Sequence, residues 1–248
     1  MSAARSTASH TLHLLSAGAA QGLVQSLQPA LEAATGARLQ GRFGAVGAMK
    51  EALLAGEPAD LFISTNKMVL ELIADDRLRA GSEMPLGCVH TGVAVRADEG
   101  DGAATATAAI IATPEALRAA LAAATALFFP DPERATAGIH FAKVLAELGL
   151  ADATRARWRT YPNGATAMRE MVNAGRAGAI GCTQVSEILI TPGVRLLGAL
   201  PKRFELATLY TAAVAAAAQR PEAATRCIAL LSAAAERAVR QRCGFDEP

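Results

Sequence analysis

Small and polar residues gather where expected strands give way to expected helices. Three such junctions lie early in the chain, at 16–20 (SAGAA), 44–47 (GAVG) and 64–66 (STN), and two more at 135–138 (ATAG) and 163–166 (NGAT). A helix N-terminus presents unpaired N–H groups and the positive end of the helix dipole, which suits an anion. Small side chains let an anion approach that backbone closely. Ordinary helix capping explains any one junction equally well, but their number and order favour an anion-binding cleft.

The residues expected to contact the anion come from these junctions and from the strand-like segment that ends at Gln184. They are Ser16, Ala17, Gly18, Ala19, Ala45, Val46, Ser64, Thr65, Arg134, Thr136, Ala137, Gly138, Ala165, Thr166, Thr183 and Gln184. Arg134 is either an ordinary surface charge or a ligand contact, since a guanidinium recognises carboxylates through its planar fork. The second reading makes an organic di- or tricarboxylate the expected ligand.

The elements that must position these residues follow an alternating pattern. Short apolar runs alternate with helical patterns, which is typical of an α/β fold with a mostly parallel sheet. We predict a first lobe made of 10–88 plus 212–248 and a second lobe at 93–205, with hinge crossings at 89–92 and 206–211. Two crossings between lobes permit hinge closure around a ligand. Ligands of such sheets bind at the carboxyl ends of the strands.

Composition excludes nucleic acids and membranes as partners, which leaves the small anionic ligand suggested by the junctions. Lys plus Arg number 24 and Asp plus Glu number 23, so the net charge of +1 gives no field that would attract nucleic acid. Aromatic residues make up 4%, too few to favour base stacking, and the 52% hydrophobic content excludes intrinsic disorder. Pro114, Glu115 and Arg118 interrupt the apolar stretch at 103–129, so we expect no membrane insertion.

The chain also lacks the motifs of common cofactor and metal enzymes. It contains neither G-x-S-x-G nor a G-x-G-x-x-G followed by an acidic residue, and no metal-ligand spacing, so we expect no cofactor and no metal. Its cysteines are not spaced as C-x-x-C and fit free thiols of a reducing compartment, with one disulfide left open. They are Cys88, Cys182, Cys227 and Cys243.

The first ten residues, MSAARSTASH, do not have the pattern of a signal peptide. The sequence as written therefore predicts a cytoplasmic protein, or a periplasmic one if a leader was removed. Only an exported form would have an ABC importer permease as its partner.

Six segments, in order, resemble the molybdate-binding periplasmic proteins, which are substrate-binding receptors of ABC importers. These segments are LLSAGAA, FGAVGAM, PADLFIS, PDPERATAGI, AIGCTQVSE and RCGF, and the resemblance spans about 11–245. PADLFIS at 58–64 and the P-D-P…A-G-I pattern at 130–139 are its most specific parts. The resemblance implies the type 2 periplasmic-binding-protein fold, with two lobes, each a mostly parallel sheet flanked by helices, and a ligand cleft between them.

The resemblance also implies which side chains would hold an oxyanion. The family uses two serine hydroxyls and a tyrosine hydroxyl, and the matching positions here are Ala19, Val46 and Gln184. Each lost hydrogen bond to a buried anion costs about 1.5–3 kcal/mol, so three losses weaken binding by several orders of magnitude. We therefore expect anion binding without a preference for molybdate or tungstate.

An enzymatic alternative stays open beside this binding function. One offshoot of the family, aconitate isomerase, shifts a double bond in a tricarboxylate. That reaction needs a carboxylate clamp, a base and exclusion of water. If the chain is an isomerase of this kind, His140 and His90 are the candidate proton carriers, because histidine titrates near neutral pH.

Overall fold

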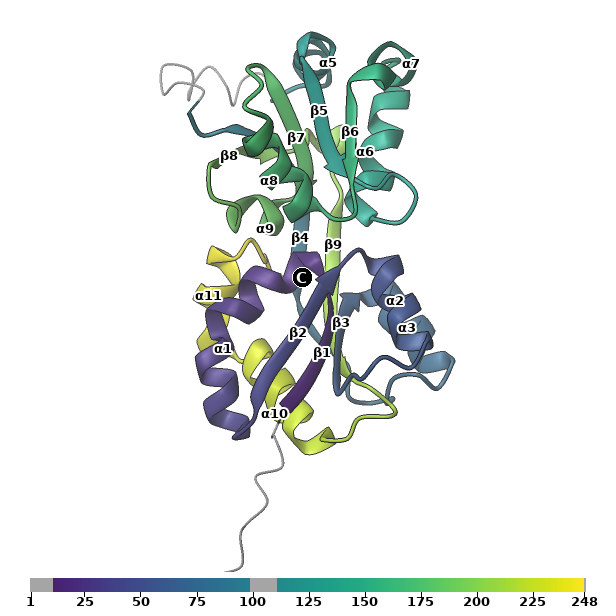
Figure 1. Cartoon of the computed structure of the whole chain (residues 1–248), viewed down its shortest axis with the longest axis vertical. Helices are drawn as coiled ribbons and strands as arrows, with labels where there is room; N and C mark the ends of the chain where they lie inside the picture. Colours follow the sequence, from purple (N-terminus) through teal and green to yellow (C-terminus); the bar gives the residue numbers. More distant parts are fainter. Residues whose placement is uncertain (1–10, 99–110, 248) are drawn as a thin grey trace, which may run out of the picture.

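A computed structural model describes residues 11–98 and 111–247. Residues 10 and 248, the expected outer limits of the first lobe, lie outside these ranges. The structure has two lobes joined by the long strands β4 (Met84–Arg96) and β9 (Ala207–Val214) (Figure 1). One nine-stranded sheet runs through both lobes in the order β2-β1-β3-β9-β4-β7-β5-β6, with β8 paired to β4. The two-lobed α/β fold expected from the sequence is confirmed.

Lobe 1 is built around three parallel strands, β1 (Thr11–Ala17), β2 (Arg38–Gly44) and β3 (Leu61–Thr65). Ala17 pairs with Gly44 and Ser16 with Ile63, so the three strands end at one edge of the sheet. β9 then pairs antiparallel to β3. This register brings the turns after β1 and β2 side by side, which is where the sequence predicts anion contacts.

Helices cover both faces of the lobe 1 sheet, and their apolar spacing explains the packing. In α1 (Gln21–Thr35), Leu23, Leu27 and Leu31 recur every four residues and are buried against the sheet, and Gly36 ends the helix with φ 65°. The remaining elements of this lobe are η1 (Gly18–Ala20), α2 (Val46–Leu54), α3 (Asn66–Ala74), α10 (Pro221–Ser232), η5 (Ala234–Glu236) and α11 (Arg237–Arg242).

Lobe 2 repeats the arrangement with β5 (Ala126–Pro130) parallel to both β6 (Trp158–Tyr161) and β7 (Ala179–Gln184). Its core includes Phe129, whose ring packs edge-on against those of Phe141 and Trp158. The ring centroids lie 5.2 and 5.1 Å apart, respectively. The other elements are α5 (Pro114–Ala123), α6 (Thr136–Glu147), α7 (Ala151–Thr154), η3 (Arg155–Arg157), α8 (Gly164–Ala174), α9 (Val185–Leu189), β8 (Val194–Ala199) and η4 (Lys202–Phe204).

β4 connects the two lobes by changing its partners midway. Residues up to His90 pair with β9, whereas residues from Thr91 onward pair with β7 and β8. At the change, the Thr91 N–H donates to the Leu206 carbonyl, and the Leu200 N–H donates to the Thr91 carbonyl, both at 3.0 Å. The backbone is thus fully hydrogen-bonded where the chain crosses between lobes. Across residues 11–98 and 111–247, no helix combines the length and the apolar character needed to cross a membrane.

Candidate functional site

A small pocket, with a cavity volume of about 20 Å³, lies between the lobes and opens to solvent. Lobe 1 contributes the turns after β1 and β2, and lobe 2 contributes the N-termini of α6 and α8 and the end of β7. The lining residues are Ala17, Gly18, Ala19, Gly44, Ala45, Val46, Pro130, Ala135, Thr136, Ala137, Asn163, Gly164, Gln184, Glu187 and Tyr210. Half of the predicted ligand contacts are among them, namely Ala17, Gly18, Ala19, Ala45, Val46, Thr136, Ala137 and Gln184.

Two helices, one from each lobe, point uncapped N-termini at this pocket. The residue before α2 is Ala45 and the residue before α6 is Ala135, and neither helix has a side-chain cap. Alanine cannot accept a hydrogen bond from the first backbone N–H groups of a helix, which Ser, Thr, Asp or Asn usually does. By contrast, Thr65 caps α3 and Asn163 caps α8. The backbone donors of α2 and α6 are therefore suited to a bound anion.

Eight predicted contacts lie outside the pocket lining, and among them Ser16, Ser64, Thr65 and Thr166 are either buried or hydrogen-bonded to other groups of the protein. The Ser16 hydroxyl donates to the Ala17 carbonyl at 2.9 Å, and the Thr65 hydroxyl accepts from the Met68 N–H at 3.3 Å. Ser64 is fully buried, and its hydroxyl has no hydrogen-bond partner in the described structure. Thr166 donates its N–H to the capping side chain of Asn163 at 2.8 Å.

Arg134 lies beside the pocket and bridges the two lobes. Its guanidinium forms an ion pair with Glu51 of α2, and both side chains are half-exposed. The backbone carbonyl of Arg134 also lies 3.4 Å from the position that a Cβ on Gly47 would occupy. The start of α6 therefore packs directly against the start of α2 across the interlobe boundary.

Gly138 supports the pocket wall from behind. A Cβ at this position would lie well under 3.0 Å from the carbonyl oxygens of Pro130 and Asp131, and 2.7 Å from the carbonyl carbon of Asp131. Only glycine permits this close approach between the first turn of α6 and the end of β5. Gly138 thus positions Pro130, which lines the pocket, without lining it itself.

Glu187 is the main residue that the sequence did not predict. It lies on α9, is 5% exposed, and its carboxylate accepts from the Gly164 N–H at 3.1 Å and from the Thr183 hydroxyl at 2.6 Å. The backbone N–H groups of Ala165 and Gln184 donate to it as well. Burial raises the pKa of this carboxyl, and these hydrogen bonds act in the opposite direction. Ala165 and Thr183, two predicted ligand contacts, therefore bind a protein carboxylate.

Tyr210 brings a phenol to the floor of the pocket from β9. It is 2% exposed, and burial followed by the nearby Glu187 charge raises its pKa far above the usual range. With the Gln184 amide nitrogen turned to the carbonyls of Val89 and His90, at 3.2 Å each, the amide oxygen accepts from the Tyr210 hydroxyl at 3.3 Å. The floor of the pocket is thereby joined to both crossing strands.

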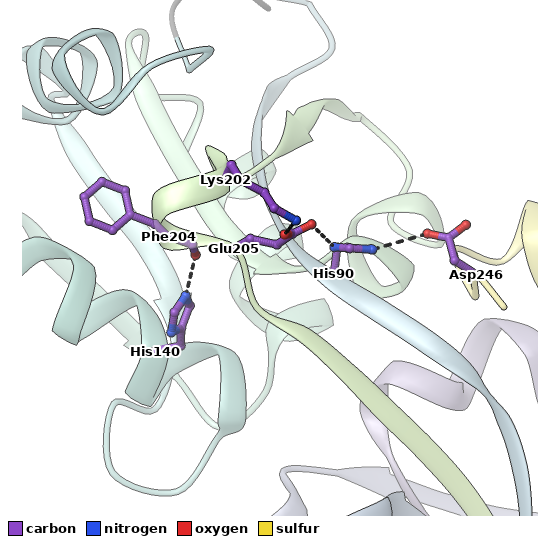
Figure 2. Close-up of polar contacts among 6 residues, drawn as sticks. All are labelled: His90, His140, Lys202, Phe204, Glu205 and Asp246. Carbon is purple, nitrogen blue, oxygen red and sulfur yellow. Dashed lines mark hydrogen bonds and ion pairs between the residues drawn. The ribbon is translucent and has the colours of Figure 1, made fainter. Parts of the chain in front are cut away.

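The two candidate histidines lie outside the pocket lining. Figure 2 shows them with their polar partners. His140 on α6 places Nε2 2.7 Å from the Phe204 carbonyl. His90 on β4 lies between two carboxylates, with Nδ1 3.4 Å from Glu205 and Nε2 3.6 Å from Asp246. A role for either in proton transfer stays a prediction, whereas Glu187 and Tyr210 are the titratable side chains in the lining itself.

All four cysteines are free, and burial raises the pKa of Cys227 to about 11. Raised pKa values keep thiols protonated and poorly nucleophilic. Within the described ranges, no group of three or more His, Cys, Asp and Glu side chains is arranged to hold a metal ion. The lining itself offers backbone N–H groups, the Thr136 hydroxyl, two side-chain amides, one carboxyl and one phenol.

Comparisons with known proteins agree with this architecture. Residues 12–246 match the family model described as bacterial extracellular solute-binding protein. The periplasmic molybdate-binding protein of Azotobacter vinelandii superposes with a TM-score of 0.77 at 17% identity, covering 96% of this chain and 99% of that one. The sulfate-binding protein SubI of Mycobacterium tuberculosis H37Rv gives 0.70 at 16% identity, over 95% and 86%. An aconitate isomerase from Pseudomonas sp is 28% identical over 222 residues, 86% of this chain and 79% of the relative.

Proposed function

We propose, from the premise that the chain belongs to the bacterial extracellular solute-binding protein family, that its two lobes close on a small organic carboxylate anion. The observation that carries the proposal is the pair of uncapped helix N-termini, of α2 and α6, that line one pocket from opposite lobes. An anion bound there would accept from the first N–H groups of both helices and so hold the lobes together.

The side chains of the lining favour an organic anion over molybdate or sulfate. Ala19 and Val46 line the pocket at the positions where the molybdate-binding family has serine hydroxyls, and they supply no hydrogen bond. The polar side chains that remain in the lining are those of Thr136, Asn163, Gln184, Glu187 and Tyr210. A fully oxygenated tetrahedral anion needs donors on every side, whereas a carboxylate needs them on one side and presents carbon elsewhere.

Calorimetry tests this proposal directly. Citrate and malate are titrated into the protein, with molybdate and sulfate for comparison, and we expect the organic anions to bind more tightly. Ala45→Asp places a carboxylate at the N-terminus of α2 and should weaken binding at least tenfold by competing for the same N–H groups. Thr113→Asp adds the same charge to α5, whose capping residue Thr113 is outside the pocket lining, and should leave affinity unchanged. Equal effects of the two variants would contradict the proposal.

A second candidate function is isomerisation of an unsaturated polycarboxylate. The relative named aconitate isomerase favours it, since the similarity extends over 86% of this chain. A double-bond shift needs a group that removes a proton from one carbon and returns one to another. Glu187 and Tyr210 are candidates for this role because they line the pocket, beside the histidines that the sequence suggested. Incubation with trans-aconitate, followed by NMR for the cis isomer, tests it, and no turnover at high protein concentration would exclude that substrate.

The location and macromolecular partner follow from the same proposal. The family is described as extracellular, which favours an exported form over the cytoplasmic location suggested by residues 1–10. An ABC importer permease would then receive the ligand from the closed lobes. Co-purification of tagged protein with membrane components encoded beside its gene would test this partner.

A further inference from the structure

The third helix N-terminus at the pocket, that of α8, is already occupied by a carboxylate from the protein itself. Glu187 accepts from the N–H groups of Gly164 and Ala165, the first two residues of that helix. The anion site expected at 163–166 is therefore filled in the absence of any ligand. The pocket combines open helix N-termini, those of α2 and α6 among them, with one fixed hydrogen-bond acceptor.

This acceptor faces the other lobe as well as its own. A Cβ on Gly18 of lobe 1 would lie 2.5 Å from Oε1 of Glu187, and a Cβ on Gly164 of lobe 2 would overlap the carboxylate. Glycine at both positions leaves the carboxylate directly against the turn after β1, in the lining of the pocket. A ligand held by the two open N-termini would therefore lie next to Glu187.

A carboxylate that is held by neutral donors, and that lies beside a bound anion, discriminates between anions. The groups that act on Glu187 are neutral donors, namely the Thr183 hydroxyl and backbone N–H groups, and its titratable neighbour is Tyr210. Within the described part of the chain, no formal positive charge therefore offsets its repulsion of a second anion. A ligand that carries a hydroxyl or a protonated oxygen can donate to Glu187, whereas a fully deprotonated oxyanion presents only acceptors.

We propose that Glu187 makes this pocket select anions that carry their own hydrogen-bond donor and reject anions that carry none. This inference rests on the proposed anion-binding function and names the ligand class for it: hydroxylated or partly protonated acids. An anion without a donor binds only when Glu187 takes up a proton, so its affinity falls as pH rises. Burial, which raises the pKa of Glu187, brings that proton uptake closer to neutral pH.

Two matched pairs of ligands test the proposal by calorimetry. Citrate and tricarballylate differ by one hydroxyl, and hydrogen phosphate carries a proton that sulfate, an anion of the same charge and tetrahedral shape, lacks. We expect the wild-type protein to prefer citrate and hydrogen phosphate by about 10- to 100-fold, the range for a hydrogen bond to a charged group. Glu187→Gln keeps the shape of the side chain, because the Thr183 hydroxyl can turn and accept from the new amide. It should reduce both preferences to within about threefold.

A measurement on the wild-type protein alone guards against a variant that fails to fold. Tricarballylate binding at pH 8, followed in two buffers of different ionisation enthalpy, should take up close to one proton per ligand, and citrate binding should take up none. Equal affinities within each wild-type pair, zero proton uptake with tricarballylate, or a preference that survives in a folded Glu187→Gln protein would each overturn the proposal. If neither pair binds nor any ligand of the wider panel, the anion-binding function itself fails, which is a different and recognisable result.

Discussion

Gly138→Ala should destabilise the protein and the pocket together. The new methyl carbon would lie 2.7 Å from the carbonyl carbon of Asp131, and closer still to the carbonyl oxygens of Pro130 and Asp131. Carbon atoms in contact normally lie about 3.5 Å apart or more, so α6 and the end of β5 must separate by about 0.8 Å. The obstructing atoms belong to the backbone, which cannot rotate away as a side chain would.

The size of the effect follows from two opposing contributions. Overpacking of this kind costs about 1–3 kcal/mol, and replacing a helical glycine by alanine returns about 0.5–1 kcal/mol. Because the obstructing atoms are backbone, the overpacking cost should lie near the upper end of its range. The net loss is then about 2–2.5 kcal/mol, which corresponds to a decrease in Tm of about 4–10 °C for a chain of this size. Ligand affinity should fall as well, because Pro130 and the first turn of α6 both line the pocket.

Differential scanning calorimetry with and without ligand measures both effects. Gly47→Ala is the matched control, since it changes a glycine in the first turn of α2 whose nearest neighbour would lie 3.4 Å from the new Cβ. We expect its Tm to stay the same or rise slightly. A Gly138→Ala protein as stable as Gly47→Ala would refute the argument that this close approach requires glycine.

Three further predictions follow from side chains around the pocket. Glu51→Gln removes the interlobe ion pair with Arg134. Because both side chains are half-exposed, we expect at most about a fivefold loss of ligand affinity, and a smaller loss at high salt. Titrations at two ionic strengths check this, and unchanged affinity at low salt would exclude a role in closure. Ser64→Ala removes a fully buried hydroxyl that lacks a partner, so Tm should stay the same or rise with ligand affinity unchanged, whereas a loss of affinity would make Ser64 a ligand contact. Because burial raises the pKa of Glu187 above 4.5, the native state binds a proton more tightly than the unfolded state, and this stabilisation is lost as pH rises from about 4.5 through the native pKa. Tm of Glu187→Gln should therefore vary less with pH than wild-type Tm over that window, and parallel curves would contradict a raised pKa.

Local sequence patterns located most of the sheet. The apolar runs TLHLLS at 11–16 and ELATLYTAAV at 205–214 predict strands from the sequence, and these are β1 (Thr11–Ala17) and β9 (Ala207–Val214). β8 (Val194–Ala199) was not predicted, because Arg195 and Gly198 interrupt its short apolar segment. β6 (Trp158–Tyr161) was missed as well, because four residues are too few for a periodic signal. Both strands are defined by tertiary pairing more than by their own composition.

The residues of the candidate site, like the strands, were only partly predictable from the sequence. Backbone contacts at strand ends were predictable, because parallel strands end at a common edge and small residues mark the turns there. Glu187 was not predicted, since nothing in V-S-E shows that a short helix carries this carboxylate to the N-terminus of α8, 23 residues earlier in the chain. Tyr210 lies within an ordinary strand pattern, and only the pairing of β9 with β4 places it beside Gln184. The signal that could have suggested the Glu187 contact is a glutamate near residues where helices are expected to start.

The distribution of helix caps links stability to binding in this fold. α3, α5 and α8 begin at Thr65, Thr113 and Asn163, whose side chains each accept a backbone N–H. α2 and α6 begin at alanines, and an alanine in place of such a cap costs about 1 kcal/mol. Because these two helices face each other across the lobes, a single anion can supply both missing caps, and it can do so only when the lobes are closed. On the proposed function, anion uptake and closure would occur as one event, and these backbone donors would compensate for the serine hydroxyls that Ala19 and Val46 do not supply.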